Sequence, residues 1–315
     1  MQIIYYGAPG TGKSFSIDEY MRSNSIPDDR IFRTTFHPEY SYCDFVGQLL
    51  PSVKKAPGAT STTITYEFSK GVFTRALEKA YLDTSKEVFL VIEEMSRGNC
   101  AAIFGDIFQL LDREKTGVNK GYSRYFICNE MIAKDIIAIP DDHVKLPPNL
   151  SILGTVNTSD QNVFTMDTAF KRRFDWKYIS TKPVPFGKPY KNNIDIELYD
   201  GTSKINISWV DLYGVLNKFI ADSRWLELGE DKQLGQFFIT FDTKTGFTGN
   251  KAKIQNKLLH FLWDDVHNVA YKNNIKLFCD EVRSFSELYD RFGDDKQIFS
   301  STFFDCINLW KAGTL

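Results

Sequence analysis

Short apolar or β-branched runs alternate with amphipathic stretches in the first half of the chain. The runs lie at 2–6, 31–36, 88–92 and 151–156, and glycine or polar residues follow each of them. Runs of this length that stop at turn residues are typical of strands buried in a parallel sheet. The sequence therefore predicts several buried strands.

The intervals between these runs carry apolar residues at helical spacing. This spacing predicts helices at 13–22 and 71–83, a helix that Asn99 caps, and a short helix at 165–172. Strands that alternate with helices are typical of an α/β domain with a parallel sheet flanked by helices. Three other intervals lack this periodicity, and we expect a structured loop at 36–50, a mobile tip at 53–61 and an insertion with a hairpin at 113–147.

The character of the chain changes after Trp176. Prolines and glycines at 180–206 suggest a linker, and helical patterns dominate beyond it. Ser208 and Asp211 resemble a capping box, and Ile254, Leu258, Leu262, Val266 and Val269 form an apolar stripe. We therefore expect two domains, an α/β domain at 1–185 and a smaller, mostly helical domain at 186–315.

Composition narrows the class of protein. The 315 residues are 43% hydrophobic and 25% charged, with a formal net charge of −2, which excludes a surface that is basic throughout. No apolar run approaches the ~20 residues of a membrane span, and no signal-peptide pattern is present. The five cysteines lack C-x-x-C spacing, so we expect reduced thiols in a cytoplasmic protein: Cys43, Cys100, Cys128, Cys279 and Cys306.

A phosphate-binding motif follows the first strand. Residues 7–14 match G-x-x-x-x-G-K-[ST], in the required order of strand, loop and helix, as Gly7-Ala8-Pro9-Gly10-Thr11-Gly12-Lys13-Ser14. The glycines let backbone N–H groups converge on phosphates, Lys13 can reach the β- and γ-phosphates, and Ser14 can ligate Mg²⁺. A chance match in a chain of this length has a probability of about 1%. A nucleoside triphosphate is therefore the expected ligand, against the alternative of a plain glycine-rich turn.

Two carboxylates end the third run. Glu93 and Glu94 follow the apolar residues 88–92. In a P-loop enzyme one such carboxylate holds the Mg²⁺ shell and the next polarises the attacking water. We assign the metal role to Glu93, together with Ser14, and the catalytic role to Glu94. The usual pair is Asp-Glu, and two solvated carboxylates after a core strand are the alternative.

A polar sequence also ends the fourth run. Asn157 and Asp160 belong to Asn157-Thr158-Ser159-Asp160. One interpretation is a degenerate N-K-x-D guanine-reading motif, although its lysine is missing. The other places Asn157 beside the P-loop, where it contacts the γ-phosphate or orients the attacking water. An Asn/Asp turn without a catalytic role is the third.

Two arginines end the predicted helix at 165–172. Arg172 and Arg173 lie in Phe170-Lys171-Arg172-Arg173-Phe174. An arginine supplied across a subunit boundary can stabilise a transferring phosphoryl group, with an effect of ~10³ to 10⁵ in rate. The alternative is a basic helix end that complements the helix dipole.

The order of these motifs resembles the GTPase subunit of McrBC-type, modification-dependent restriction systems, within the AAA+ superfamily. The resemblance runs from Ile3 to about Trp176. Besides the motifs above it rests on the following pieces: Phe36-His37-Pro38-Glu39-Tyr40-Ser41-Tyr42, Asp44-Phe45-Val46, Gly71-Val72-Phe73, Met95-Ser96-Arg97-Gly98-Asn99 and Ile103-Phe104-Gly105-Asp106. The family signature M-N-x-x-D-R has Val156 for Met and Gln161 for Arg here.

The resemblance implies an AAA+ fold with a helical lid and a ring, as a hexamer, with Mg²⁺ and nucleotide at subunit interfaces. It implies GTP as fuel, although relatives use ATP, and an McrC-like endonuclease partner. It places the chain in a DNA restriction system used in phage defence. The family's N-terminal DNA-recognition domain has no counterpart here, so the protein is either naturally minimal or part of a longer one.

Three functions fit these residues. The first is the NTP-hydrolysing motor of an McrBC-like restriction complex, the second a MoxR-like ATPase that remodels protein complexes, and the third a nucleotide-gated scaffold with little turnover. His37, Tyr40 and Tyr42 either face DNA or pack on the protein, and residues 231–235 can place a polar group near the nucleotide. The choice between GTP and ATP, the ring size and the DNA target are not determined by the sequence.

Overall fold

The computed structural model describes residues 1–315 except 55–62, 137, 140, 159–163, 185–191 and 271–274. The predicted domain boundary at 185/186 lies outside the described residues. Contacts divide the chain into two compact units. The N-terminal unit comprises Met1–Tyr6, Ser14–Asn157 and Gln161–Tyr178, and the C-terminal unit comprises Gly7–Lys13, Thr158–Asp160 and Ile179–Leu315.

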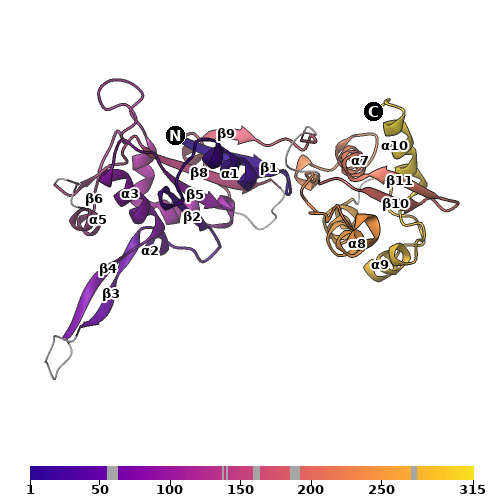
Figure 1. The fold of residues 1–315 in the computed structure, drawn as a ribbon, viewed down its shortest axis with the longest axis horizontal. Helices are drawn as coiled ribbons and strands as arrows, with labels where there is room; N and C mark the ends of the chain where they lie inside the picture. The colour runs from indigo at the N-terminus through magenta and orange to yellow at the C-terminus, as the bar shows by residue number, and fades with distance from the viewer. Residues whose placement is uncertain (55–62, 137, 140, 159–163, 185–191, 271–274) are drawn as a thin grey trace. The chain divides into compact units, whose positions relative to one another are not determined.

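A five-stranded parallel sheet forms the centre of the N-terminal unit (Figure 1). Its strands follow the order β2-β5-β8-β1-β9. Val88 to Ile92 are completely buried in β5, as expected for a strand covered on both faces. The predicted α/β fold with a parallel sheet is confirmed, with these strand bounds: β1 (Gln2–Gly7), β2 (Ile31–Thr35), β5 (Val88–Glu93), β8 (Leu150–Asn157) and β9 (Asp175–Tyr178).

Six α-helices belong to the described part of this unit. Helix α3 buries the predicted stripe of Val72, Phe73, Ala76, Leu77 and Ala80. The helix that Asn99 caps is shorter than its apolar stripe, because Gly105 has a φ of 50° and the chain continues in 3-10 turns to Leu111. The last helix covers only part of the predicted 165–172. The bounds are α1 (Lys13–Ser23), α2 (Tyr42–Phe45), α3 (Val72–Leu82), α4 (Cys100–Phe104), α5 (Glu130–Asp135) and α6 (Thr168–Lys171).

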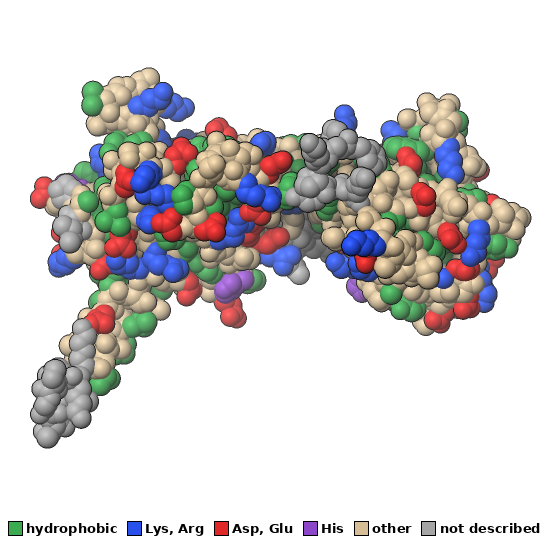
Figure 2. Space-filling view, viewed as in Figure 1, with side chains coloured by type: hydrophobic (Ala, Val, Ile, Leu, Met, Phe, Trp, Pro, Cys, Tyr) green, Lys and Arg blue, Asp and Glu red, His purple; other side chains and the backbone are tan. Residues whose placement is uncertain are grey.

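A β-hairpin, which the sequence patterns did not predict, projects from this unit (Figure 1). Its strands β3 (Gly47–Lys54) and β4 (Thr63–Lys70) pair antiparallel, and the predicted mobile tip lies mostly outside the described residues. The register puts apolar side chains of both strands on one face: Leu49, Pro51, Val53, Ile64, Tyr66 and Phe68. Figure 2 shows hydrophobic side chains in green along the hairpin. Residues 64–68 alternate between apolar and polar side chains, and this alternation is the sequence signal that could have predicted β4.

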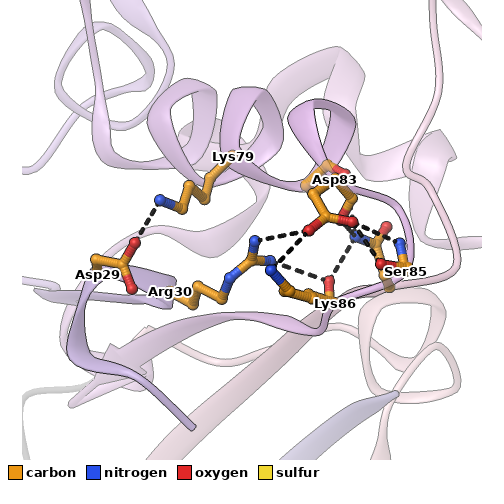
Figure 3. A network of polar contacts seen from close by, with 8 residues as sticks. Asp29, Arg30, Lys79, Asp83, Ser85 and Lys86 are labelled. Carbon is orange, nitrogen blue, oxygen red and sulfur yellow. Dashed lines mark hydrogen bonds and ion pairs between the residues drawn. The ribbon is translucent and has the colours of Figure 1, made fainter.

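A polar network fixes the start of the sheet (Figure 3). The buried Arg30 donates to the Asp83 carboxylate at 3.4 Å and to the Lys86 carbonyl at 3.3 Å. Hydrogen bonds from Ser85 and Lys86 lower the pKa of Asp83 to about 2. Lys79 and Asp29 form a neighbouring ion pair. These contacts connect the end of α3 to the segment that precedes β2.

Residues 113–147 contain α5 and the short antiparallel strands β6 (Ile127–Cys128) and β7 (His143–Val144). The Arg113 guanidinium donates to the carbonyls of Gly121, Leu146, Pro147 and Leu150. Burial lowers the pKa of Arg113 to about 10. This side chain therefore attaches the segment to the beginning of β8.

The C-terminal unit has its own apolar core. The prediction of a linker at 180–206 is wrong in part, because β10 and β11 form a hairpin there, and alternating Ile196, Leu198 and Ile207 are buried in it. Ser208 caps α7 as predicted, and of the predicted stripe only Val269 is exposed. Its elements are β10 (Asp195–Tyr199), β11 (Lys204–Ser208), α7 (Trp209–Ala221), α8 (Gly246–Lys253), π-helical turns at Ile254–Leu259 and Leu262–Val266, α9 (Phe285–Gly293) and α10 (Ser301–Lys311).

Two further predictions concern the state of the cysteine thiols and whether the chain spans a membrane. All five cysteines are free, and burial raises the pKa of the Cys100 thiol to about 12. Among the described residues, no helix combines the length and the apolar composition that crossing a membrane requires.

Candidate nucleotide site

The phosphate loop joins β1 to α1. Gly10 and Gly12 have φ values of 77° and 91°, a region that L side chains rarely adopt. The Lys13 ammonium donates to the carbonyl oxygens of Gly7 and Ala8, each at 3.0 Å. The loop therefore has the backbone conformation that the motif requires, and Lys13 lies against the loop itself.

The loop residues Gly7–Lys13 belong to the C-terminal unit, and two backbone amides of that unit donate hydrogen bonds to them. The amides of Gly235 and Phe237 donate to the carbonyls of Pro9 at 2.9 Å and Gly10 at 2.8 Å. A Cβ atom on Gly235 would lie 2.4 Å from the amide nitrogen of Thr11, which no real Cβ contact tolerates. The sequence pointed to residues 231–235 but not to this backbone contact.

The two predicted metal ligands meet in the N-terminal unit. The Ser14 hydroxyl donates to Oε2 of Glu93 at 2.8 Å. Helix α1 presents Ser14 in its first turn, and β5 presents Glu93 as its last residue. A hydroxyl and a carboxylate are the hard oxygen donors that Mg²⁺ prefers. The extra methylene of Glu93 does not prevent contact with Ser14.

The catalytic candidate Glu94 lies immediately after β5. Its backbone is left-handed, with φ 51° and ψ 44°, a conformation that costs a non-glycine residue ~1–3 kcal/mol and clusters at functional sites. The Asn157 amide donates to both oxygens of Glu94, at 2.9 and 2.8 Å. The Nε atom of Arg97 lies 3.5 Å from Oε2 of Glu94. The structure thus brings together Asn157 and Glu94 from the ends of β8 and β5.

The remaining catalytic candidates are Asp160, Arg172 and Arg173, and the two arginines differ in burial. Asp160 lies outside the described residues. Arg173 is largely buried, where it donates to Asp112 at 2.7 Å and stacks over Phe108 at 4.0 Å. Arg172 is exposed and lines a cavity of about 820 Å³ that Asn157 also lines. Of the two arginines, Arg172 is the more exposed, whereas the guanidinium of Arg173 is engaged by Asp112 and Phe108.

Two functional candidates were missed from the sequence. The Thr155 hydroxyl donates to Glu93 Oε2 at 2.7 Å and accepts from the Glu94 amide at 3.1 Å. Arg33 Nη1 donates to Glu93 Oε1 at 2.7 Å. Only the alignment of the strands could have pointed to these two residues. Thr155 lies two residues before Asn157 on β8, and Arg33 pairs with Val91, two residues before Glu93.

The loop predicted at 36–50, which contains Tyr40 and Tyr42, packs against other residues of the N-terminal unit. The Thr34 hydroxyl donates to the Tyr40 hydroxyl at 3.0 Å, and Tyr42 donates to Asp106 at 3.0 Å. Only His37 of the three residues considered for DNA contact is mostly exposed. The described geometry therefore favours packing over base stacking for Tyr40 and Tyr42.

Magnesium fits the donors that the site offers. The described residues include no cluster of three or more His, Cys, Asp or Glu side chains suited to a metal ion. Mg²⁺ commonly uses one or two protein oxygens and completes its octahedron with phosphates and water. Ser14 and Glu93 match that pattern.

Comparison with protein families agrees with this geometry. The family model of the AAA domain, dynein-related subfamily, matches residues 2–174. The chain belongs to this AAA family. Its phosphate loop, β5 and β8 all lie within the matched segment, so the chain has the nucleoside-triphosphatase domain of that family.

Two curated relatives come from restriction systems. The type II restriction enzyme BsuMI component YdiS of Bacillus subtilis is 34% identical over 94% of this chain and 87% of its own length. The type IV methyl-directed restriction enzyme EcoKMcrB subunit of Escherichia coli is 26% identical over 55% of this chain. The match covers 34% of that subunit's length. The predicted resemblance to McrB-like AAA+ proteins is thereby confirmed.

A search of solved structures gave a putative ATPase from Cytophaga hutchinsonii. It is 13% identical over 95% of this chain and 86% of its own, with a TM-score of 0.31.

Proposed function

We propose that the protein hydrolyses GTP or ATP and acts as the motor subunit of an McrBC-like restriction complex. The contact that carries this proposal is the 2.8 Å hydrogen bond between Ser14 and Glu93, next to the Glu94–Asn157 pair. It joins the first helix turn after the phosphate loop to the acidic strand end. Relatives of the same family that are components of restriction enzymes support the biological setting.

Each residue has a chemical task in this proposal. The backbone amides of residues 7–14 and the Lys13 ammonium bind the polyphosphate. Ser14 and Glu93 would hold Mg²⁺, which would neutralise charge on the phosphate oxygens. Glu94 accepts a hydrogen bond from the attacking water and takes its proton, and Asn157 orients the Glu94 carboxylate.

The assembly is part of the proposal. Subunits form a ring, as a hexamer, in which Arg172 of one subunit reaches the nucleotide of the next, and the buried Arg173 supports the position of α6. An McrC-like endonuclease is the partner, and DNA is contacted through the complex or through a further domain. Asp160 completes the polar segment after β8.

Nucleotide turnover tests the proposal directly. The wild type, Lys13→Ala and Glu94→Gln are assayed with GTP and with ATP, with Mg²⁺ and with a co-purified nuclease partner. We expect Lys13→Ala to lose nucleotide binding, and Glu94→Gln to bind but to turn over ~10²- to 10⁴-fold more slowly. Equal rates in all three proteins would refute the enzymatic function.

Two further outcomes separate the alternatives. Tight binding by the wild type without turnover, even with the partner, would indicate a nucleotide-gated scaffold. Turnover that responds to a protein complex other than a nuclease would indicate a MoxR-like remodelling ATPase.

A further inference from the structure

Three donors surround the carboxylate of Glu93. Oε2 accepts from Ser14 at 2.8 Å and from Thr155 at 2.7 Å, and Oε1 accepts from Nη1 of Arg33 at 2.7 Å. The other terminal nitrogen of Arg33 donates to the Asp18 carboxylate. Glu93 is therefore held from both sides, and Arg33 has one carboxylate on each arm of its guanidinium.

The fold explains why Arg33 is at this position. Strand β2 pairs with β5 in parallel, with Arg33 opposite Val91 and Thr35 opposite Glu93. A guanidinium extends far enough to reach a carboxylate two residues further along the next strand. Asp18 belongs to α1, the helix that also presents Ser14. Arg33 thus connects the helix after the phosphate loop to the strand that presents Glu93.

The length of Glu93 makes this connection important. Glutamate has one more rotatable bond than the aspartate usual at this position, so its carboxylate can turn away from Ser14. With Oε1 held by Arg33, Oε2 stays on the side of Ser14 and Thr155. The side chain of Glu93 is 16% exposed and that of Arg33 is 37% exposed, so the Glu93 carboxylate is largely shielded from solvent while Arg33 is partly exposed.

We propose that Arg33 is a positioning residue for the divalent cation, which fixes the longer acid Glu93 in the orientation that binds metal together with Ser14. This inference rests on the proposed nucleotide chemistry. It concerns geometry rather than charge, because Arg33 is itself a cation and would oppose Mg²⁺ if it acted only electrostatically. The fork of the guanidinium, which contacts Glu93 and Asp18 together, is the property that matters.

Arg33→Lys tests the fork at constant charge. Mn²⁺ is titrated into protein with a fixed concentration of a non-hydrolysable GTP or ATP analogue, and free Mn²⁺ is measured by electron paramagnetic resonance. We expect Arg33→Lys to weaken Mn²⁺ binding about tenfold, as is usual when the group that orients a metal ligand is lost. Arg283→Lys, an exposed arginine of the C-terminal unit, is the matched control and should bind as the wild type does.

Glu93→Asp supplies the second arm of the test. Aspartate has one rotatable bond fewer, so the orientation of its carboxylate depends less on Arg33. Adding Arg33→Lys to Glu93→Asp should therefore change Mn²⁺ binding less than about twofold. Near-ultraviolet circular dichroism of each variant shows that the unit is folded.

The outcomes distinguish this inference from the function on which it rests. A wild type that binds no Mn²⁺ with either nucleotide analogue would overturn both. A wild type that binds Mn²⁺, with Arg33→Lys binding equally or more tightly, would overturn the role of Arg33 and leave the nucleotide site intact. A loss of the same size whether Arg33→Lys is made in the wild type or in Glu93→Asp would also overturn it.

Discussion

Asn157 donates its side-chain amide to both carboxylate oxygens of Glu94, at 2.9 and 2.8 Å. The two residues come from the ends of neighbouring strands, β8 and β5. Because Glu94 also has a left-handed backbone, the orientation of its carboxylate depends on the residues around it. Asn157 is therefore the residue whose loss should disturb Glu94 most directly.

We expect Asn157→Ala to lower kcat by roughly 10- to 100-fold with little change in nucleotide affinity, since it removes an orienting group and leaves the phosphate loop intact. Steady-state turnover and equilibrium binding of a fluorescent nucleotide measure the two effects. Asn308→Ala, at an exposed position of α10, is the control. A loss confined to affinity would assign Asn157 to binding instead.

The two arginines after α6 should separate by phenotype. Arg172→Ala should keep the thermal stability of the wild type and reduce turnover by ~10³-fold or more. Arg173→Ala should lower Tm, because it removes the ion pair with Asp112 and the contact with Phe108. Calorimetry and turnover assays measure these effects.

Mixing variants shows whether Arg172 acts between subunits. Arg172→Ala and Lys13→Ala should each be inactive alone, but in the proposed ring a mixture of the two would pair an intact phosphate loop with an intact Arg172. Turnover should therefore reappear in the mixture. No recovery would place the action of Arg172 within its own subunit.

Gly235→Ala should weaken nucleotide binding by about tenfold or more. Its Cβ atom would lie 2.4 Å from the Thr11 amide nitrogen, and overpacking of this kind costs ~1–3 kcal/mol. Isothermal titration with GTP and ATP analogues measures the loss. Gly293→Ala in the same unit meets only the flexible end of Gln255, at 3.2 Å, and should bind normally. Equal affinities for both variants would show that the contact with the loop does not affect binding.

Asp83 should contribute acid-sensitive stability. Its folded pKa is lowered to about 2 from an ordinary value of 3.8, so the contribution is complete above about pH 4 and is lost as the pH falls towards 2. The difference in unfolding midpoint between the wild type and Asp83→Asn should therefore be constant above about pH 4 and shrink below it. Asp305→Asn, outside this network, is the control. A difference that does not change between about pH 5 and pH 2 would contradict this assignment.

Two isoleucines should differ in their effect on stability. Ile152→Ala in β8 removes a completely buried side chain and should cost about 2–5 kcal/mol. Ile64→Ala on the hairpin, where the side chain is 64% exposed, should stay within about 0.5 kcal/mol. Urea unfolding followed by circular dichroism measures both. A large cost at Ile64 would show that its side chain is covered in solution.

The sequence predicted the sheet and part of the site for a definite reason. Buried parallel strands are continuous apolar runs, and motifs such as residues 7–14 combine residue type with spacing, so both can be read locally. The structure brings Ser14 into contact with Glu93 and Asn157 into contact with Glu94, and the roles of these residues stay predictions.

The missed features depend on residues far apart in the chain. Arg33 and Thr155 reach Glu93 only through the register of β2, β5 and β8, which no local pattern encodes. The hairpin of β3 and β4 is the exception, because its strands are close in the chain and residues 64–68 alternate locally between apolar and polar side chains. Gly235 contributes a backbone amide, and every residue except proline has one.

The amides of Gly235 and Phe237 donate to Pro9 and Gly10, so that stretch cannot be displaced without breaking the outer hydrogen bonds of the phosphate loop. A polyphosphate that immobilises residues 7–14 would therefore restrict how far residues 235–237 can travel. Release of the nucleotide would return that freedom through the backbone alone, without any side chain having to sense the phosphate.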